Sequence, residues 1–364
     1  MLFDSTVRRE LARSFGATLV VILTIVLTMF LIRTLGQAAS GKVAPQDVVL
    51  LLGFVTLGHL ATILALSLFV AIVLTLGRMY RDSEMAIWFA SGAGLARFIP
   101  PVMGLAWPVL VVIALLLLFV WPWSNRQSLE LRERYQQRSD LARIAPGQFQ
   151  TSSDGRRVFF VERESADGVN ARNVLILTRT EQAEAVTSAR NGRLVNEGND
   201  RFLVLEKGQR NEIDMRKYDK TLSRFETYRT LVHERVIDTS GMRSPPTTRT
   251  IELIRDGSRE SQGELVWRLG LLAAATNLVL LGIGLAASNP RRPSNWNLLF
   301  ALLAFVIYML NFVNLTQAWV VAGRVQAGPA LVALHGGMFV LALLLIYWRD
   351  HAVVLRVWPR RSAA

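Results

Sequence analysis

The stretch VVLLLGFVTLGHLATILALSLFVAIVLTL, residues 48–76, decides the fold because it contains no Lys, Arg, Asp or Glu. A membrane-spanning helix needs about 20 consecutive apolar residues. Five further runs have comparable length, and the only charged residue in any run is Arg268, near the start of the fourth. These runs are Phe15–Ile32, Phe98–Trp121, Leu265–Ala287, Leu298–Val321 and Ala330–Ile346. The sequence therefore predicts a polytopic α-helical membrane protein with six transmembrane helices, three before and three after a polar insertion.

The first apolar run has an alternative interpretation as the core of a signal peptide. It is long for that role, and no A-x-A-like cleavage site clearly follows it. A retained helix is therefore the favoured interpretation. Hydrophobic residues make up 51% of the 364-residue chain, which is ordinary for a membrane protein.

Arginine and lysine are unevenly distributed between the two ends of the predicted helices. Cytoplasmic flanks of membrane helices are enriched in these residues. One set of ends carries twelve arginines: Arg8, Arg9, Arg13, Arg78, Arg81, Arg97, Arg291, Arg292, Arg349, Arg356, Arg360 and Arg361. The opposite ends carry Arg33, Lys42 and Arg324. We expect both termini to be cytoplasmic and the large insertion to lie on the outer side of the membrane. The net charge of +13 reflects this asymmetry more than a nucleic-acid surface.

Residues 124–263 form the polar insertion, with 25 Lys/Arg and 21 Asp/Glu. Short segments of alternating or β-branched character predict an all-β, jelly-roll-like domain. The expected strands are Arg157–Glu162, Asn173–Thr180, Ala185–Ala189, Arg201–Glu206 and Phe225–Arg235. The turn signals are Asp154-Gly155, Asp167-Gly168, Asn191-Gly192 and Gly198-Asn199-Asp200. A charged linker, Ser240–Gly263 with Pro245-Pro246, is expected to return the chain to the fourth helix.

The predicted domains are thus residues 1–123, 124–263 and 264–364. An edge of the β domain either accepts a strand from another chain or is blunted by charge, and composition alone favours the second. The chain has no cysteine, which excludes disulfides and thiolate metal sites. Its four histidines, His59, His233, His335 and His351, form no ligand-spaced cluster, so no metal site is expected.

The loop between the second and third helices has the signals of a short helix at about residues 82–91. Asp82 is the expected N-cap, Glu84 lies in the first turn, and Gly92 suits the C-terminal stop. Helical spacing places three apolar side chains on one face: Met85, Trp88 and Phe89. This face lies either on the membrane surface or in a groove of a cytoplasmic partner, and the residues alone leave both open.

Seven short motifs occur along the chain in a family-specific order. They are Leu66–Phe69, Thr75–Tyr80, Ser83-Glu84, Ser91-Gly92, Pro122–Arg126, Pro146–Phe149 and Asn289–Arg292. The pattern resembles the LptF/LptG family of lipopolysaccharide export permeases, and the resemblance spans nearly the whole chain.

The resemblance implies a non-catalytic permease subunit in the inner membrane of a Gram-negative bacterium. Such a subunit pairs with an LptG-like permease above two LptB-like ATPases, which hold ATP and Mg²⁺. Lipopolysaccharide then passes through β-jelly-roll domains to LptC and LptA. The short loop helix resembles the family's coupling helix, with Glu84 at its acidic contact position. Asp82, Met85 and Trp88 are supporting candidates for the same contact.

The candidate substrate contacts are cations and amides. They lie near the outer face of the membrane that the helices span. Arginine grips phosphate with paired hydrogen bonds, although each cation also suits ordinary lipid headgroups. Arg33 is the strongest candidate because the family carries a basic residue at this point. The other candidates are Lys42, Arg324, Asn311, Asn314 and Gln317. The three amides serve either helix packing, their commoner role, or a cavity wall beside a lateral gate.

Other classes of protein account for the sequence less well. The stretch GQAASGKV, residues 36–43, is nearly a P-loop, but Val43 lacks the Mg²⁺-binding hydroxyl and the stretch follows a membrane helix. No catalytic motif of a membrane enzyme is present. The alternative is a permease of another lipid- or lipoprotein-exporting, or mechanotransmission, ABC system. The three-plus-three helix count argues against it.

Overall fold

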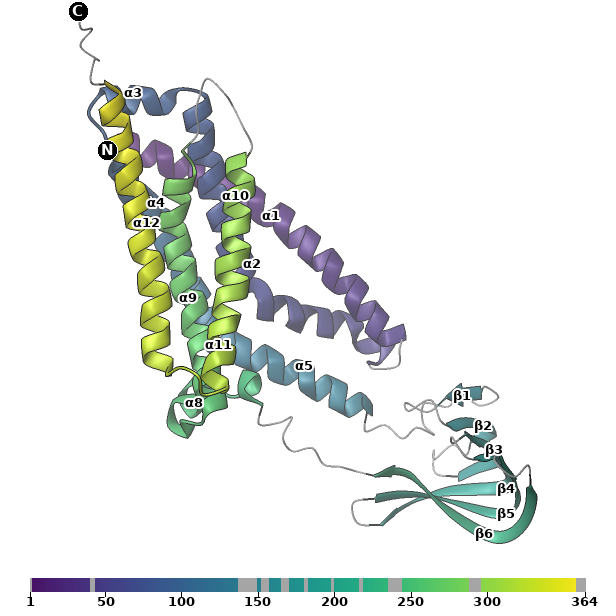
Figure 1. Cartoon of the computed structure of the whole chain (residues 1–364). Coiled ribbons are helices and arrows are strands. Elements are labelled where there is room, and N and C mark those ends of the chain that lie inside the picture. Colours follow the sequence, from purple (N-terminus) through teal and green to yellow (C-terminus); the bar gives the residue numbers. More distant parts are fainter. Residues whose placement is uncertain are drawn as a thin grey trace, which may run out of the picture. The chain divides into compact units, whose positions relative to one another are not determined.

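The computed structural model describes residues 2–39, 43–136, 149–151, 157–164, 170–179, 183–197, 200–215, 219–234, 244–287 and 296–357. The chain divides into two compact units. One comprises Met1–Arg132 with Ser240–Ala364, and the other comprises Glu133–Thr239. The first unit is a bundle of helices and the second carries a β-sheet (Figure 1).

The six predicted membrane helices are confirmed among the described residues. Two of them pass through a π-helical turn, η3 or η5. The first three spans are α1 (Leu2–Ala39), α2 (Val48–Arg81), and α4 (Ile99–Leu115) with η3 (Leu116–Val120) and α5 (Trp121–Gln136). The last three are α9 (Arg259–Leu285), α10 (Trp296–Phe305) with η5 (Val306–Phe312) and α11 (Val313–Val321), and α12 (Ala327–Val357).

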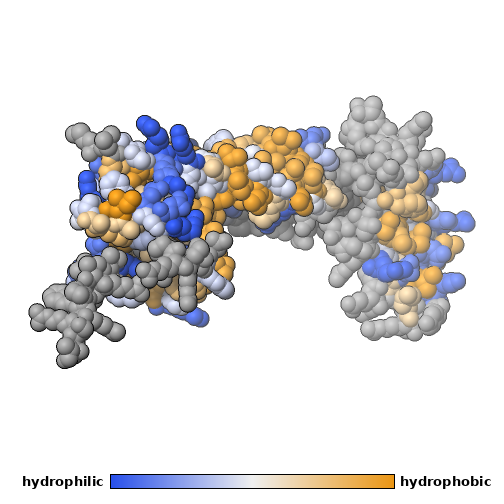
Figure 2. Space-filling model, turned by 90° about the horizontal axis from the view of Figure 1, so that it is seen from above, coloured by the Kyte–Doolittle hydropathy of each residue, from blue (hydrophilic) through white to orange (hydrophobic). Residues whose placement is uncertain are grey.

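Helices α2 and α9 form the centre of the bundle. In the most apolar stretch of each helix, 78% of the residues of the α2 span and 72% of those of α9 are buried within this chain. The corresponding share for α1 is 6%. Gly282 permits the close approach of α9 to α2, because a Cβ at this position would lie 3.0 Å from Cγ2 of Ile72. Seen from above, apolar side chains cover much of the exposed helical surface (Figure 2). Such a surface suits lipid or a partner's membrane helices.

The short helix predicted in the second loop is present as α3 (Glu84–Ala90). Gly92 has a positive φ of 86° just after it, as expected of a helix stop. The predicted N-cap is wrong: Ser83 occupies that position in a left-handed conformation, and Asp82 instead ends α2. The carboxylate of Asp82 turns back to Arg78, one turn earlier in α2, at 3.3 Å. This i, i+4 ion pair competes with capping.

The inserted all-β domain is also confirmed. Its described strands form one antiparallel sheet in which the strand order follows the chain, so the connections are those of a meander. The strands are β1 (Phe149–Thr151), β2 (Arg157–Glu164), β3 (Asn170–Arg179), β4 (Ala183–Glu197), β5 (Asp200–Asp214) and β6 (Lys220–Glu234). A small apolar core includes Val174, Ile176, Ala189, Leu203 and Leu205.

The strands are longer than their apolar segments predict, and one predicted turn is wrong. Asn191-Gly192 lies inside β4, where Asn191 pairs with Glu206 and Gly192 pairs with Leu205. A Cβ on Gly192 would lie 3.1 Å from Val174, so the glycine serves close packing rather than a turn. The signals Asp154-Gly155, Asp167-Gly168 and Gly198-Asn199 lie outside the described residues.

Much of the expected linker Ser240–Gly263 is helical. It contains the 3₁₀ turn η4 (Pro245–Thr247), the helix α8 (Thr250–Asp256) and the first turn of α9. Ser258 caps α9 by accepting a hydrogen bond from the backbone N–H of Ser261. The hydroxyls of Ser258 and Ser261 both donate to Asp256, which lowers the pKa of this carboxyl. Side-chain capping thus folds a segment that composition alone marks as linker.

Candidate functional site

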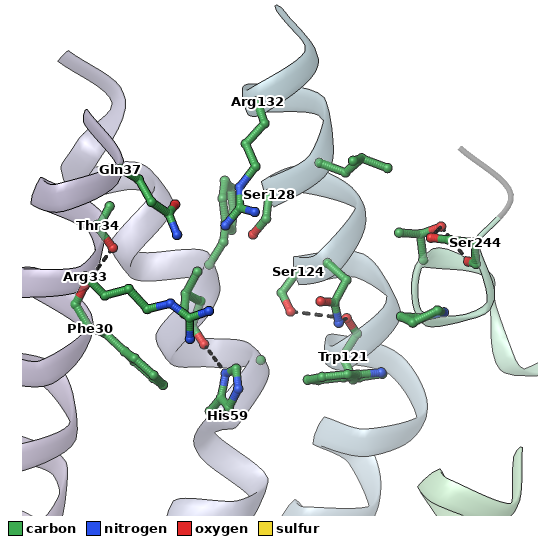
Figure 3. Close-up of a pocket in the computed structure, with 17 residues that line it drawn as sticks. Phe30, Arg33, Thr34, Gln37, His59, Trp121, Ser124, Ser128, Arg132 and Ser244 are labelled. Atoms are coloured by element: carbon green, nitrogen blue, oxygen red, sulfur yellow. Dashed lines mark hydrogen bonds between the residues drawn. The ribbon is translucent and has the colours of Figure 1, made fainter. Parts of the chain in front are cut away.

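A cavity of about 400 Å³ lies between one end of α1, the first half of α2, helix α5 and the segment around η4. Figure 3 shows polar side chains projecting into it from different helices. The part contributed by α1 follows helical spacing: Phe30, Arg33, Thr34 and Gln37. One face of α5 supplies a matching stripe: Trp121, Ser124, Asn125, Ser128 and Arg132.

Helices α2 and α5 approach closely at Gly58. A Cβ there would lie 3.1 Å from the hydroxyl oxygen of Ser124, so a larger residue would push the two cavity walls apart. His59 follows on the same wall, and its Nδ1 lies 2.9 Å from the carbonyl oxygen of Val55. The rings of Phe30 and Trp121 flank the imidazole at 4.9 and 6.0 Å. One end of the cavity is therefore aromatic.

The charge of the cavity is positive. Arg33 from α1 and Arg132 from α5 both extend into it (Figure 3). None of the described residues lining the cavity is acidic, and no described carboxylate forms an ion pair with either arginine. The Nε of Arg132 is buried without a hydrogen-bond partner in the described part of the chain. Two like charges and an unused donor favour an anion carrying several oxygens.

Of the predicted substrate contacts that the structure describes, only Arg33 lines this cavity. Lys42 lies outside the described residues. Arg324 is exposed near the end of α11 and is not part of the cavity. Asn311 donates to the carbonyl oxygen of Val306 in its own helix.

The remaining amides of the fifth span also lie away from the cavity. Asn314 accepts a hydrogen bond from the indole N–H of Trp267 in α9 at 2.9 Å. Gln317 is half-buried close to Gly263, also in α9. Packing between the fourth and fifth spans therefore engages both side chains.

The predicted contact residues of α3 divide into buried and accessible ones. Met85 is 1% exposed in the core of the bundle, and Trp88 packs on Phe3 with ring centroids 4.5 Å apart. The apolar face of α3 is thus covered by its own chain, which neither alternative for this face anticipated. Ile87 is 70% exposed. Glu84 is half-exposed, 3.6 Å from Arg78.

Arg132 was missed because the sequence assigns residues after 123 to the polar insertion, whereas α5 continues to Gln136. A signal for this helix was available in the sequence. The polar residues Ser124, Asn125, Ser128 and Arg132 follow Trp121 at positions i+3, i+4, i+7 and i+11. Such a stripe marks one helix face. Arg126 in the same helix pairs with Glu130 instead, at 3.2 Å.

Two histidines have structural surroundings. His335 is buried, and its Nδ1 lies 2.7 Å from the hydroxyl of Tyr308. Asn277 donates to that hydroxyl and to the carbonyl oxygen of His335. This cluster joins α9, η5 and α12. His351 lies against Tyr347 one turn earlier. No group of three or more potential metal ligands occurs in the described residues.

Six membrane-spanning helices, an inserted antiparallel β domain and a cationic cavity among the helices define a polytopic membrane protein with a candidate anion site. The chain belongs to the lipopolysaccharide export system permease LptF/LptG family, whose model matches residues 6–349. Members are the non-catalytic transmembrane subunits of an ABC transporter.

Among curated proteins, the chain is similar to the lipopolysaccharide export system permease protein LptF of Escherichia coli strain K12. The two are 28% identical over 355 residues, which cover 96% of this chain and 93% of the relative. LptF of Escherichia coli O157:H7 and LptF of Shigella flexneri match to the same extent. The family's role in lipopolysaccharide export therefore applies to this multi-pass membrane protein.

Proposed function

We propose that this chain is the LptF-type half of a lipopolysaccharide exporter and holds a phosphate of the lipid in the cavity between Arg33 and Arg132. It pairs with an LptG-like permease in a Gram-negative inner membrane, with both termini cytoplasmic and the β domain periplasmic. Two LptB-like subunits hold ATP and Mg²⁺, and the β domain delivers the lipid to LptC and LptA. The LptF relatives and the arginine asymmetry support these roles.

The two-arginine cavity is the observation that carries the substrate assignment. Arg33 and Arg132 extend into a space whose described lining residues include no acid, near the ends of two membrane spans. A phosphate group accepts paired hydrogen bonds from guanidinium and relieves the repulsion between the two cations. The hydroxyl of Ser128 lies on the same wall as a further donor, whereas that of Ser124 donates to the carbonyl oxygen of Trp121.

Photocrosslinking tests this assignment. A photoreactive phenylalanine analogue at Phe54, an aromatic residue of the cavity wall, is expected to capture lipopolysaccharide in cells. Arg33→Gln and Arg132→Gln should each reduce the yield, and the double variant should nearly abolish it. Arg126→Gln is the matched control, because Arg126 lies on α5 but pairs with Glu130 outside the cavity. Equal yields from Arg132→Gln and Arg126→Gln would remove Arg132 from the site.

The surface of α3 supports the contact with the ATPase. Its exposed side chains include Ile87, Ala86 and Ala90, with Glu84 beside them. Small residues around one large apolar side chain suit insertion into a partner's groove, and Glu84 supplies the charge. Met85 and Trp88 act indirectly by holding α3 on the bundle, and Asp82 acts through Arg78.

Copurification with the ATPase tests this surface. Ile87→Asp and Glu84→Lys should reduce recovery of the ATPase and ATP turnover while the helical bundle remains folded. The controls are Ile254→Asp and Glu252→Lys in α8, another seven-residue helix, in which Ile254 is 65% exposed. The chain purified without its partners should hydrolyse no ATP, and turnover by the lone chain would refute the permease assignment.

A further inference from the structure

A buried charge cluster lies beside the cavity, at the start of α9. Arg268 is fully buried and its Nε donates to the carboxylate of Glu264 at 2.9 Å. Its Nη2 donates to the carbonyl oxygens of Pro245 and Thr248, at 3.1 and 3.0 Å. One guanidinium thus holds both ends of the η4 turn. Arginine suits this task because its donors have a fixed planar arrangement.

Thr250 extends the cluster to the third membrane span. Nη1 of Arg268 donates to its hydroxyl at 2.8 Å, and this hydroxyl donates to the carbonyl oxygen of Leu118 at 2.7 Å. Leu118 lies in the π-helical turn η3. The irregular turn of one span is therefore joined through a threonine to the arginine of another.

Glu264 connects the cluster with a second cavity wall. Its Oε1 accepts a hydrogen bond from the indole N–H of Trp121 at 2.9 Å. Trp121 lines the cavity, as do Ser244, Pro246 and Thr247 around η4. A single buried ion pair therefore makes direct hydrogen bonds to two walls that are more than a hundred residues apart in the sequence.

We infer that Arg268 is a positioning residue of the substrate cavity: with Glu264 it fixes the η4 wall and the Trp121 wall relative to each other. The inference rests on the proposed lipid-binding role of that cavity. Arg268 does not line the cavity, so it acts through η4 and Trp121. Loss of its backbone contacts releases the η4 wall and widens the space in which Arg33 and Arg132 meet the ligand.

Distance measurements between spin labels test the positioning directly. The chain contains no cysteine, so labels placed at Ser128→Cys and Thr247→Cys report the span between α5 and η4 without further changes. In the assembled exporter in lipid nanodiscs, Arg268→Lys is expected to lengthen and broaden this distance, because one ammonium cannot replace the fork that holds two carbonyls and Glu264. Thr250→Val, a milder change, should broaden it less. Arg255→Lys on exposed α8 should leave it unchanged.

A purely structural role for Arg268 would lower the unfolding midpoint but preserve the distance in the folded protein. Unchanged distances in both Arg268→Lys and Thr250→Val would overturn the proposal. Capture of lipopolysaccharide at the Phe54 photocrosslinker is measured in the same variants, and a parallel loss with Arg268→Lys supports it. If the unaltered chain captures no lipid while the distances still shift, the positioning role stands and the proposed lipid role fails.

Discussion

Two arginine clusters at different places in the helical bundle use the same chemistry with opposite surroundings. Arg268 and its partner Glu264 have side chains that are 0% and 3% exposed. Arg78 is 41% exposed and is shared by three acids, Glu10, Asp82 and Glu84, which are 30–50% exposed. Arg268 makes hydrogen bonds that no water can replace, whereas each partner of Arg78 can exchange for water or for another protein.

The difference indicates which cluster fixes geometry and which is free to change. Removing one member of a buried ion pair leaves an uncompensated charge, whereas an exposed pair contributes little because water and salt replace it. Arg268 therefore holds cavity walls in place. Glu84 is kept near Arg78 in the isolated chain but remains available to a partner.

The largest effect is expected from Glu264→Ala. This change leaves the buried Arg268 cation and the indole N–H of Trp121 without their acceptor. The free energy of unfolding in mixed micelles should fall by about 3–5 kcal/mol. Glu252→Ala in exposed α8 is the control, with an expected loss of about 0.3–1 kcal/mol from its helix-dipole position. Similar losses in the two variants would contradict the contrast between the clusters.

An intermediate effect is expected from Thr250→Val, which keeps the side-chain shape but removes the hydroxyl between Arg268 and Leu118. The loss of two hydrogen bonds should lower the free energy of unfolding by about 1–3 kcal/mol. In Thr276→Val the removed hydroxyl bonds only to its own helix, at Leu272, and the loss should be smaller. If Thr276→Val lowered the free energy of unfolding more than Thr250→Val, the hydroxyl of Thr250 would not stabilise the bundle by linking Arg268 to Leu118.

The smallest effect is expected from Arg78→Gln. It removes the ion pairs with Glu10, Asp82 and Glu84, yet the free energy of unfolding should change by only about 0–1 kcal/mol. The difference from the unaltered chain should shrink further as salt rises, because exposed charges are screened over about 10 Å at 0.1 M. Arg81→Gln serves as the control cation on the same helix. If Arg78→Gln lowered the free energy of unfolding as much as Glu264→Ala does, and salt did not change this loss, the exposed and buried clusters would not differ as proposed.

The membrane spans were predictable from the sequence because span length and apolarity are properties of a continuous stretch. Strand ends were less predictable: β4 continues through Asn191-Gly192, whose turn signal is overridden by pairing with Glu206 and Leu205 on β5. Local sequence could not reveal this, because the packing beneath Gly192 involves other strands.

The candidate site was only partly predictable for the same reason. Helical spacing placed Met85 and Trp88 on one face of α3, but only the tertiary fold shows that Phe3 and the bundle core cover it. Arg33 was predicted from its place at the outer end of the first helix together with the family resemblance at that position. Arg132 was hidden by the polar composition around it, although α5 carries it to the same cavity.

The last membrane helix also completes the loop that holds α3. The carboxylate of Asp350, in α12, accepts a hydrogen bond from the backbone N–H of Leu95 at 2.7 Å, across 255 residues of sequence. At a synthesis rate of about 5–20 residues per second, this acceptor is made on the order of 10–50 s after the loop itself. The loop therefore gains this anchor only after α12 has been synthesised. A chain truncated before Asp350 therefore lacks the side chain that anchors this loop to α12.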